Sequence, residues 1–312
     1  MPRLEKWLTA VGPDAPITRA ARKALRVRLA AVEHFLKQAG QVSGQADDDA
    51  EAVHQLRIWT RRATAALRLF DEVLPRRTAK WLKRKLRSIR LTAGEARDCD
   101  VLAERLESGD LPGLAPTAVH LRVRRKRAEK QLAKAYKSLV RGQRFCRKSD
   151  KLLGKIGSRE KSRKSPGQPK FGPWCRAQLR PLADAFFALA AGDLSKDARL
   201  HELRLAGKRL RYALELAPAA LPAATHRRLY DELSDLQDRL GQVCDQIVAA
   251  GRLKEWYDEA RGDEVRKELR TAQGEQRKQL ATSTQRFLCW WSPKRRESLR
   301  KSWERALRAD RR

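Results

Sequence analysis

Residues 201–245 read HELRLAGKRLRYALELAPAALPAATHRRLYDELSDLQDRLGQVCD. Residues 54–98 repeat this stretch without an insertion and read HQLRIWTRRATAALRLFDEVLPRRTAKWLKRKLRSIRLTAGEARD. Identical residues fall on one another at a single offset of 147 positions, including His54/His201, Arg57/Arg204, Pro75/Pro222, Gly94/Gly241 and Asp98/Asp245. So many matches at one offset indicate a tandem duplication.

Apolar residues recur at helical spacing through most of the chain, and no alternating β-branched run occurs. We therefore predict an all-α fold of two pseudo-symmetric four-helix bundles from a tandem duplication, with a basic groove between them. Glycines 94 and 241 are expected to interrupt or kink the helices that contain them. The expected helices span 18–38, 47–74, 77–91 (resuming to 106), 117–142, 145–156, 173–190, 201–217, 221–260 (divided at Gly241), 263–285 and 295–309.

A stretch rich in Ser, Pro, Gly and basic residues, GSREKSRKSPGQPKFGP, separates the two copies. We predict a first bundle at 15–156, a linker at 157–172, a second bundle at 173–292 and a basic tail at 293–312.

The net charge of +32, from 70 Lys+Arg against 38 Asp+Glu, calls for a polyanion or an anionic membrane as partner. No apolar run is long enough to span a bilayer, and the first residues lack a signal-peptide core. The 5 cysteines form no CxxC pair, which favours reduced thiols in a cytoplasmic protein.

Cations gather on one face of the first repeated helix, where His54, Arg57, Arg61 and Arg68 lie within about 60° of one another. The second copy places His201, Arg204, Lys208 and Arg211 in the same way. These stripes flank the apolar face, so neighbouring helices could present them to one groove. The predicted anion-binding residues are His54, Arg57, Arg61, Arg62, Arg68, Lys80, Lys83, Arg87, Arg90, Arg97, Arg122, Arg125, His201, Arg204, Lys208, Arg209 and Arg211.

The first copy should dominate this site. Residues 54–97 hold 13 Lys/Arg against 3 Asp/Glu, whereas 201–244 hold 7 against 6. Residues 120–164 add many more cations, but Lys130, Lys134 and their neighbours lie opposite the apolar stripe, where they would supply general attraction only.

Several residues allow more than one interpretation. His54 and His201 are ligand-facing donors, helix anchors or, less favourably among so many cations, metal ligands. Gly94 and Gly241 form an anion nest or allow close packing. Asp98 and Asp245 act as general bases or hold an arginine in place.

The motifs HxLRxxxKRLRYxxE at 201–215 and LxxLQDxLGxxxD at 233–245 resemble those of the CHAD family, the conserved histidine α-helical domains. HxLRxxxRR followed by GEARDCDVL in the first copy is similar to the N-terminal half of that family. The resemblance spans about residues 15–290 and implies a basic groove or pore that binds inorganic polyphosphate, and in several relatives association with polyphosphate granules. Thr64 stands where the second copy has Arg211, so that contact is weakened in the first copy.

The leading hypothesis is therefore non-catalytic polyphosphate binding, with no cofactor, no metal and no catalytic residue. The alternative is non-specific binding of an RNA or DNA backbone. Single-strand binders interleave aromatic and basic residues, whereas aromatic residues are 6% of this chain. A phosphohydrolase would need a carboxylate cluster or a nucleophile–base pair, and neither is evident.

Overall fold

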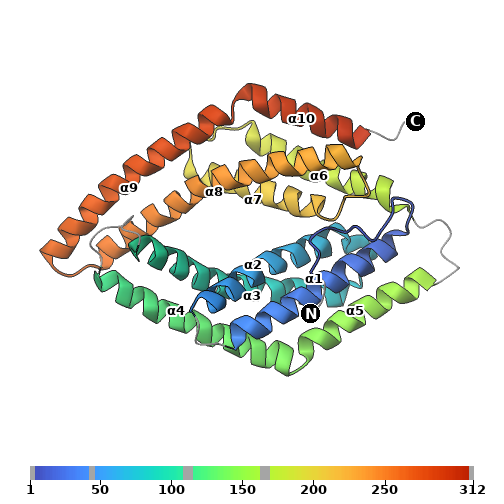
Figure 1. The fold of residues 1–312 in the computed structure, drawn as a ribbon, viewed down its shortest axis with the longest axis horizontal. Coiled ribbons are helices and arrows are strands. Elements are labelled where there is room, and N and C mark those ends of the chain that lie inside the picture. The colour runs from blue at the N-terminus through green and yellow to red at the C-terminus, as the bar shows by residue number, and fades with distance from the viewer. Residues whose placement is uncertain (1–3, 42–45, 108–114, 162–168, 309–312) are drawn as a thin grey trace. The chain divides into compact units, whose positions relative to one another are not determined.

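The computed structural model describes residues 4–41, 46–107, 115–161 and 169–308. Within them the chain is helical apart from turns, loops and one isolated backbone bridge between Pro16 and Lys170, which confirms the predicted all-α class (Figure 1). The α-helices are α1 (Ile17–Gly40), α2 (Ala46–Leu69), α3 (Arg76–Glu107), α4 (Ala115–Tyr136), α5 (Arg144–Lys161), α6 (Phe171–Ala190), α7 (Asp197–Leu214), α8 (Ala223–Glu259), α9 (Asp263–Trp290) and α10 (Pro293–Arg308). Two short turns, the 3₁₀-helix η1 (Asp71–Val73) and the π-helix η2 (Lys137–Arg141), connect α2 to α3 and α4 to α5.

Helix α1 buries the face that its sequence predicts. Leu25, Leu29, Val32 and Leu36 are each at most 1% exposed, and their spacing puts them on one side of the helix. Each such side chain contributes about 1.5–3 kcal/mol when it is fully buried. This face packs α1 against α2 and α5.

The turn between α2 and α3 sets the start of α3. The sequence predicts a helix to Leu74, but α2 ends at Leu69 and is followed by η1. Leu74 is extended, with ψ of 147°, because the ring of a following proline disfavours helical geometry in the residue before it. Helix α3 then begins directly after Pro75.

The predicted interruption of these helices at Gly94 and Gly241 is wrong. Helix α3 runs without interruption from Arg76 to Glu107, and α8 from Ala223 to Glu259. A glycine inside a helix costs only about 1 kcal/mol relative to alanine. The buried residues around Gly94, among them Ile89, Ala93 and Ala96, offset that cost.

The chain packs as two compact units that are not its two sequence halves. The first contains Met1–Val101, Leu121–Gln178 and Tyr212–Leu221, and the second contains Leu102–His120, Leu179–Arg211 and Pro222–Arg312. Helix α5 extends to Lys161, into the stretch predicted as a linker, and α6 begins at Phe171. Residues 162–168 of that stretch lie outside the described residues.

Each unit has an aromatic cluster in its core. In the first unit, Phe70 stacks on Trp174 with ring centroids 5.3 Å apart and lies 6.2 Å from Phe171. In the second unit, Phe186 meets Trp291 edge to face at 6.3 Å. These rings fix the start of α6 in one unit and its end in the other.

Candidate anion-binding site

Three arginines and a histidine of the first unit lie on α2 and α3. His54, Arg57 and Arg61 project from α2 and Arg97 from α3, and we call this set the α2–α3 cluster. Burial lowers the pKa of His54, and the negative charge of Glu51 opposes this effect. The positive charges of Arg97, Arg57 and Arg61 lower the His54 pKa further. His54, Arg57 and Arg61 lie on one face of α2 at three- and four-residue spacing, and Arg97 precedes Asp98, which Arg57 contacts on α3.

Asp98 forms an ion pair with one arginine of this cluster. Nη1 of Arg57 donates a hydrogen bond to Oδ1 of Asp98 on α3 at 3.3 Å. Burial and the charge of Arg61 lower the pKa of Arg57, while Asp98 opposes them. Within the described part of the chain, Arg61 and Arg97 have no ion pair with a carboxylate. The cluster therefore carries positive charge that its own surroundings leave unneutralised.

The second unit holds a smaller set at the repeated positions, which we call the α7–α8 cluster. It consists of His201, Arg204 and Lys208, which share one face of α7, and of Asp245 on α8; Nη2 of Arg204 lies 3.6 Å from Oδ1 of Asp245. Cys244 stands where the first copy has Arg97. Burial raises the pKa of the Cys244 thiol, and the nearby charges of Arg204 and Lys208 lower it. A neutral thiol thus replaces one cation of the first cluster.

Arg62, although predicted as an anion-binding residue, lies in a buried ion pair. Its Nε and Nη2 donate to the two carboxylate oxygens of Glu215 at 2.7 and 3.2 Å, and its guanidinium lies over the ring of Trp59. Glu215 is 0% exposed. Arg28, 1% exposed, lies near the same carboxylate and donates to the backbone oxygens of Lys6 and Ala24. We call Arg28, Arg62 and Glu215 the buried triad.

Three further predicted residues are held by partners within their own unit. Lys83 pairs with Asp71, and Arg125 bridges Asp100 and Glu129. Arg211 donates to the hydroxyl of Tyr230. Of the other predicted anion-binding residues outside the two clusters, Arg90 is half-buried. The rest have exposed side chains: Arg68, Lys80, Arg87, Arg122 and Arg209.

The structure narrows the alternatives for the repeated aspartates and glycines. Asp98 and Asp245 each contact the arginine at the matching position of their own unit, as expected of residues that hold an arginine in place. Gly94 and Gly241 lie inside continuous helices, where the backbone N–H groups are used for helical hydrogen bonds. They therefore do not form an anion nest.

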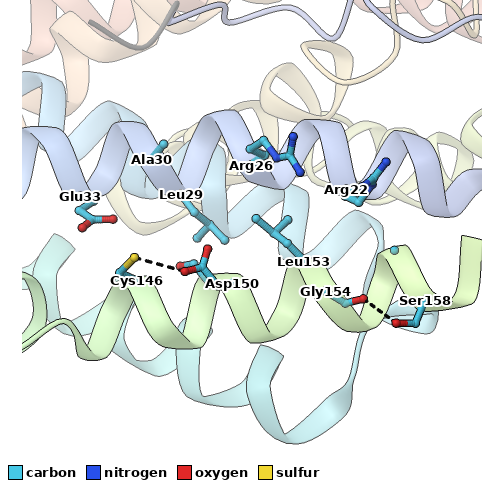
Figure 2. Close-up of a pocket in the computed structure, with 12 residues that line it drawn as sticks. Arg22, Arg26, Leu29, Ala30, Glu33, Cys146, Asp150, Leu153, Gly154 and Ser158 are labelled. Carbon is cyan, nitrogen blue, oxygen red and sulfur yellow. Dashed lines mark hydrogen bonds between the residues drawn. The ribbon is translucent and has the colours of Figure 1, made fainter.

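A cleft between α1 and α5 is a separate feature of the first unit that was not predicted from the sequence (Figure 2). Its volume is about 610 Å³. Arg22 and Arg26 line it together with Glu33 and Asp150, and Asp150 accepts a hydrogen bond from the thiol of Cys146 at 3.4 Å. Acids and bases are mixed in this cleft, so it suits a polyanion less well than the α2–α3 cluster does. Its acidic pair joins residues 117 positions apart, which no local pattern reveals.

Two other kinds of site are absent from the described residues. No group of three or more His, Cys, Asp or Glu side chains there is placed to hold a metal ion. None of the described helices has the length and apolar character required to cross a membrane.

Some known proteins are similar to this chain in sequence, and others are similar to it in fold. The chain is 30% identical over 218 residues to the uncharacterized proteins Rv2226 and MT2285 of Mycobacterium tuberculosis, a match that covers 66% of this chain and 40% of each relative. The chain therefore spans less than half the length of these relatives. In fold it is similar to the CHAD domain from the plant Ricinus communis, with a TM-score of 0.69, 22% identity and 96% of each chain covered. PptA from Streptomyces chartreusis matches with a TM-score of 0.57 and 18% identity, over 93% of this chain and 100% of that one.

These structural matches are below 25% identity and show the fold alone. The family is shown by a sequence model of the CHAD domain, which matches residues 26–254. That range includes both repeated helices with their histidines and both paired aspartates. The chain belongs to the CHAD domain family.

Proposed function

We propose that this chain binds inorganic polyphosphate, without catalysis, chiefly through the α2–α3 cluster. The α7–α8 cluster adds a weaker set of contacts. The observation that carries the proposal is that His54, Arg57 and Arg61 share one face of α2 beside Arg97 of α3, while Asp98 is the one carboxylate among the described residues that forms an ion pair with any of them. Membership of the CHAD family supports it, because the family resemblance implies polyphosphate as the ligand.

The chemistry of these side chains suits a chain of phosphates. A guanidinium presents planar N–H donors that match pairs of phosphate oxygens, and a lysine binds phosphate as a point charge. A linear polyphosphate carries negative charge on each unit, so cations spaced along a helix face contact successive units. Partial burial strengthens each contact, because a surrounding of lower polarity screens charges less than water does.

Binding to nucleic acid is the alternative that the test must separate. Non-specific backbone binding follows from positive charge alone, and the net charge here is +32. We therefore expect long-chain polyphosphate, bound at about 0.15 M salt, to resist displacement by RNA or DNA at matched phosphate concentration. Even exchange between the two polymers would show that charge alone accounts for binding and would overturn the proposal.

A pair of variants locates the site. Arg57→Gln with Arg61→Gln removes two charges from the α2–α3 cluster, and Lys130→Gln with Lys134→Gln removes two from exposed positions on α4. A hydrogen bond to a charged group is worth about 1.5–3 kcal/mol, so the first variant should bind polyphosphate at least tenfold more weakly than the wild type. The second should change affinity by less than about threefold, as expected for screened surface charges. Equal losses would mean that binding is diffuse.

A further inference from the structure

We infer that Asp98 and Asp245 are positioning residues of the anion-binding site, each orienting one arginine for contact with phosphate. The inference rests on the proposed function, because it assigns a role within that site. Its evidence is the geometry of the two pairs, Arg57–Asp98 and Arg204–Asp245, and the difference in exposure between their partners.

In both pairs the arginine is largely covered and the aspartate is clearly more exposed than its arginine. The side chains of Arg57 and Arg204 are 19% and 23% exposed, whereas those of Asp98 and Asp245 are 45% and 63% exposed. An exposed carboxylate adds little to a hydrophobic core, so packing alone does not explain its position. It does supply an acceptor that fixes the direction of a half-covered guanidinium.

Arg57 needs such a partner, because its surroundings work against its charge. Burial and the charges of Arg61 and Arg97 lower the pKa of Arg57, and Asp98 opposes them both by its charge and by its hydrogen bond. Without that carboxylate, repulsion from Arg61 and Arg97 would favour rotamers that turn the Arg57 guanidinium away from the cluster.

The pair recurs although a charged neighbour changes. Arg97, whose charge acts on Arg57, is replaced by Cys244 in the second copy. The Arg–Asp contact nevertheless forms on both sides, between α2 and α3 and between α7 and α8. If the contact depended on a cation at the position of Arg97, it would not be expected in the second copy.

The contact also leaves donors for a ligand. In the first pair, Asp98 takes its hydrogen bond from Nη1 of Arg57. A guanidinium carries five N–H donors, so one carboxylate contact of this kind does not exhaust its capacity for phosphate.

The inference predicts an effect opposite in sign to simple electrostatics. A carboxylate beside an anion site repels the ligand, so its removal should strengthen binding if charge alone matters. If Asp98 positions Arg57, then Asp98→Ala should weaken polyphosphate binding about fivefold or more. Asp98→Asn keeps an oxygen acceptor at the same place and should bind at least as tightly as the wild type.

The matched control is Asp14→Ala, which makes the same change in net charge. Asp14 is 76% exposed and pairs with Lys170 at the surface, and neither residue belongs to the α2–α3 cluster. We expect this variant to bind polyphosphate like the wild type. Asp245→Ala repeats the test in the second unit and should give a smaller loss, because the α7–α8 cluster has fewer cations.

A double-mutant cycle separates positioning from a general structural effect. In a background of Arg57→Gln, the change Asp98→Ala should no longer weaken binding, whereas it should do so in the wild-type background. Melting temperatures of all variants are measured alongside, and the exposed Asp98 should leave them unchanged. Wild-type or tighter binding by both Asp98→Ala and Asp245→Ala would overturn the inference while the proposed function stands. Failure of the wild-type chain to bind polyphosphate would instead overturn the proposed function.

Discussion

Loss of the Glu215 carboxylate should strongly destabilise the first unit. Glu215 accepts two hydrogen bonds from Arg62, and its backbone oxygen accepts a third from the N–H of Leu8. Burial lowers the pKa of Arg28 to about 10, Glu215 opposes this effect, and Arg62 adds to it. Glu215→Ala therefore leaves two covered guanidinium groups without their shared carboxylate.

The magnitude follows from burial. Because each pKa unit corresponds to about 1.4 kcal/mol, the charged form of Arg28, which still prevails at pH 7, is less stable in the folded chain than in water by about 3 kcal/mol with Glu215 in place. Removal of one partner from a buried ion pair typically costs about 3–5 kcal/mol. We expect Glu215→Ala to lower the free energy of unfolding by this amount, measured in guanidinium chloride at pH 7.

Two comparisons make the measurement decisive. Glu202→Ala removes an exposed carboxylate that pairs with Arg199 on the surface of α7, and it should cost less than about 1 kcal/mol. Arg62→Met combined with Glu215→Leu should cost less than Glu215→Ala alone, because the isolated charge of Arg62 is removed as well. A loss below about 1 kcal/mol for Glu215→Ala would refute the reasoning that the triad stabilises the unit.

Three further outcomes can be measured. Polyphosphate affinity should rise as the pH falls from about 8 to about 5.5, because bound phosphate favours the protonated form of His54, whose pKa is lowered in the free protein. Titration calorimetry should show a smaller rise in affinity over this pH range for His54→Gln. Thermal unfolding should show that Gly94→Ala stabilises the chain by about 0.5–1 kcal/mol, since the added Cβ would meet nothing within 4 Å. Gly40→Ala should instead destabilise the chain by about 1–3 kcal/mol, because its Cβ would clash with Cβ of Tyr136. Burial and the charge of Asp150 raise the pKa of Glu33 above 4.5, so the contribution of Glu33 to stability is present at low pH and is lost as the pH rises. Glu33→Gln should therefore have a higher melting temperature than the wild type at pH 7, but not below about pH 4. A lower melting temperature at pH 7 would contradict this.

Features that depend on local spacing could be predicted from the sequence. His54, Arg57 and Arg61 share a helix face because three- and four-residue steps return to the same side of an α-helix. Repetition at an offset of 147 then pointed to the matching residues His201, Arg204 and Lys208. The same logic gave the buried face of α1.

Features that depend on distant partners could not be predicted. Arg62 lies one residue from Arg61, yet it turns toward Glu215, which is 153 residues away along the chain. Helix α3 continues through Gly94 because tertiary burial outweighs the weak helix propensity of glycine. In both cases the packed core decides the result, and a pattern within one helix contains no information about that core.

The position of Glu215 along the chain also affects how the protein is made. Residues Tyr212–Leu221 pack into the first unit, although much of the second unit comes before them in sequence. Domains generally fold as units while the ribosome extends the chain from its N-terminus. Here the nascent chain contains Arg28 and Arg62 long before the carboxylate that neutralises them is added. The first unit therefore reaches its final state only after residue 215 has left the ribosome, when part of the second unit has already been synthesised.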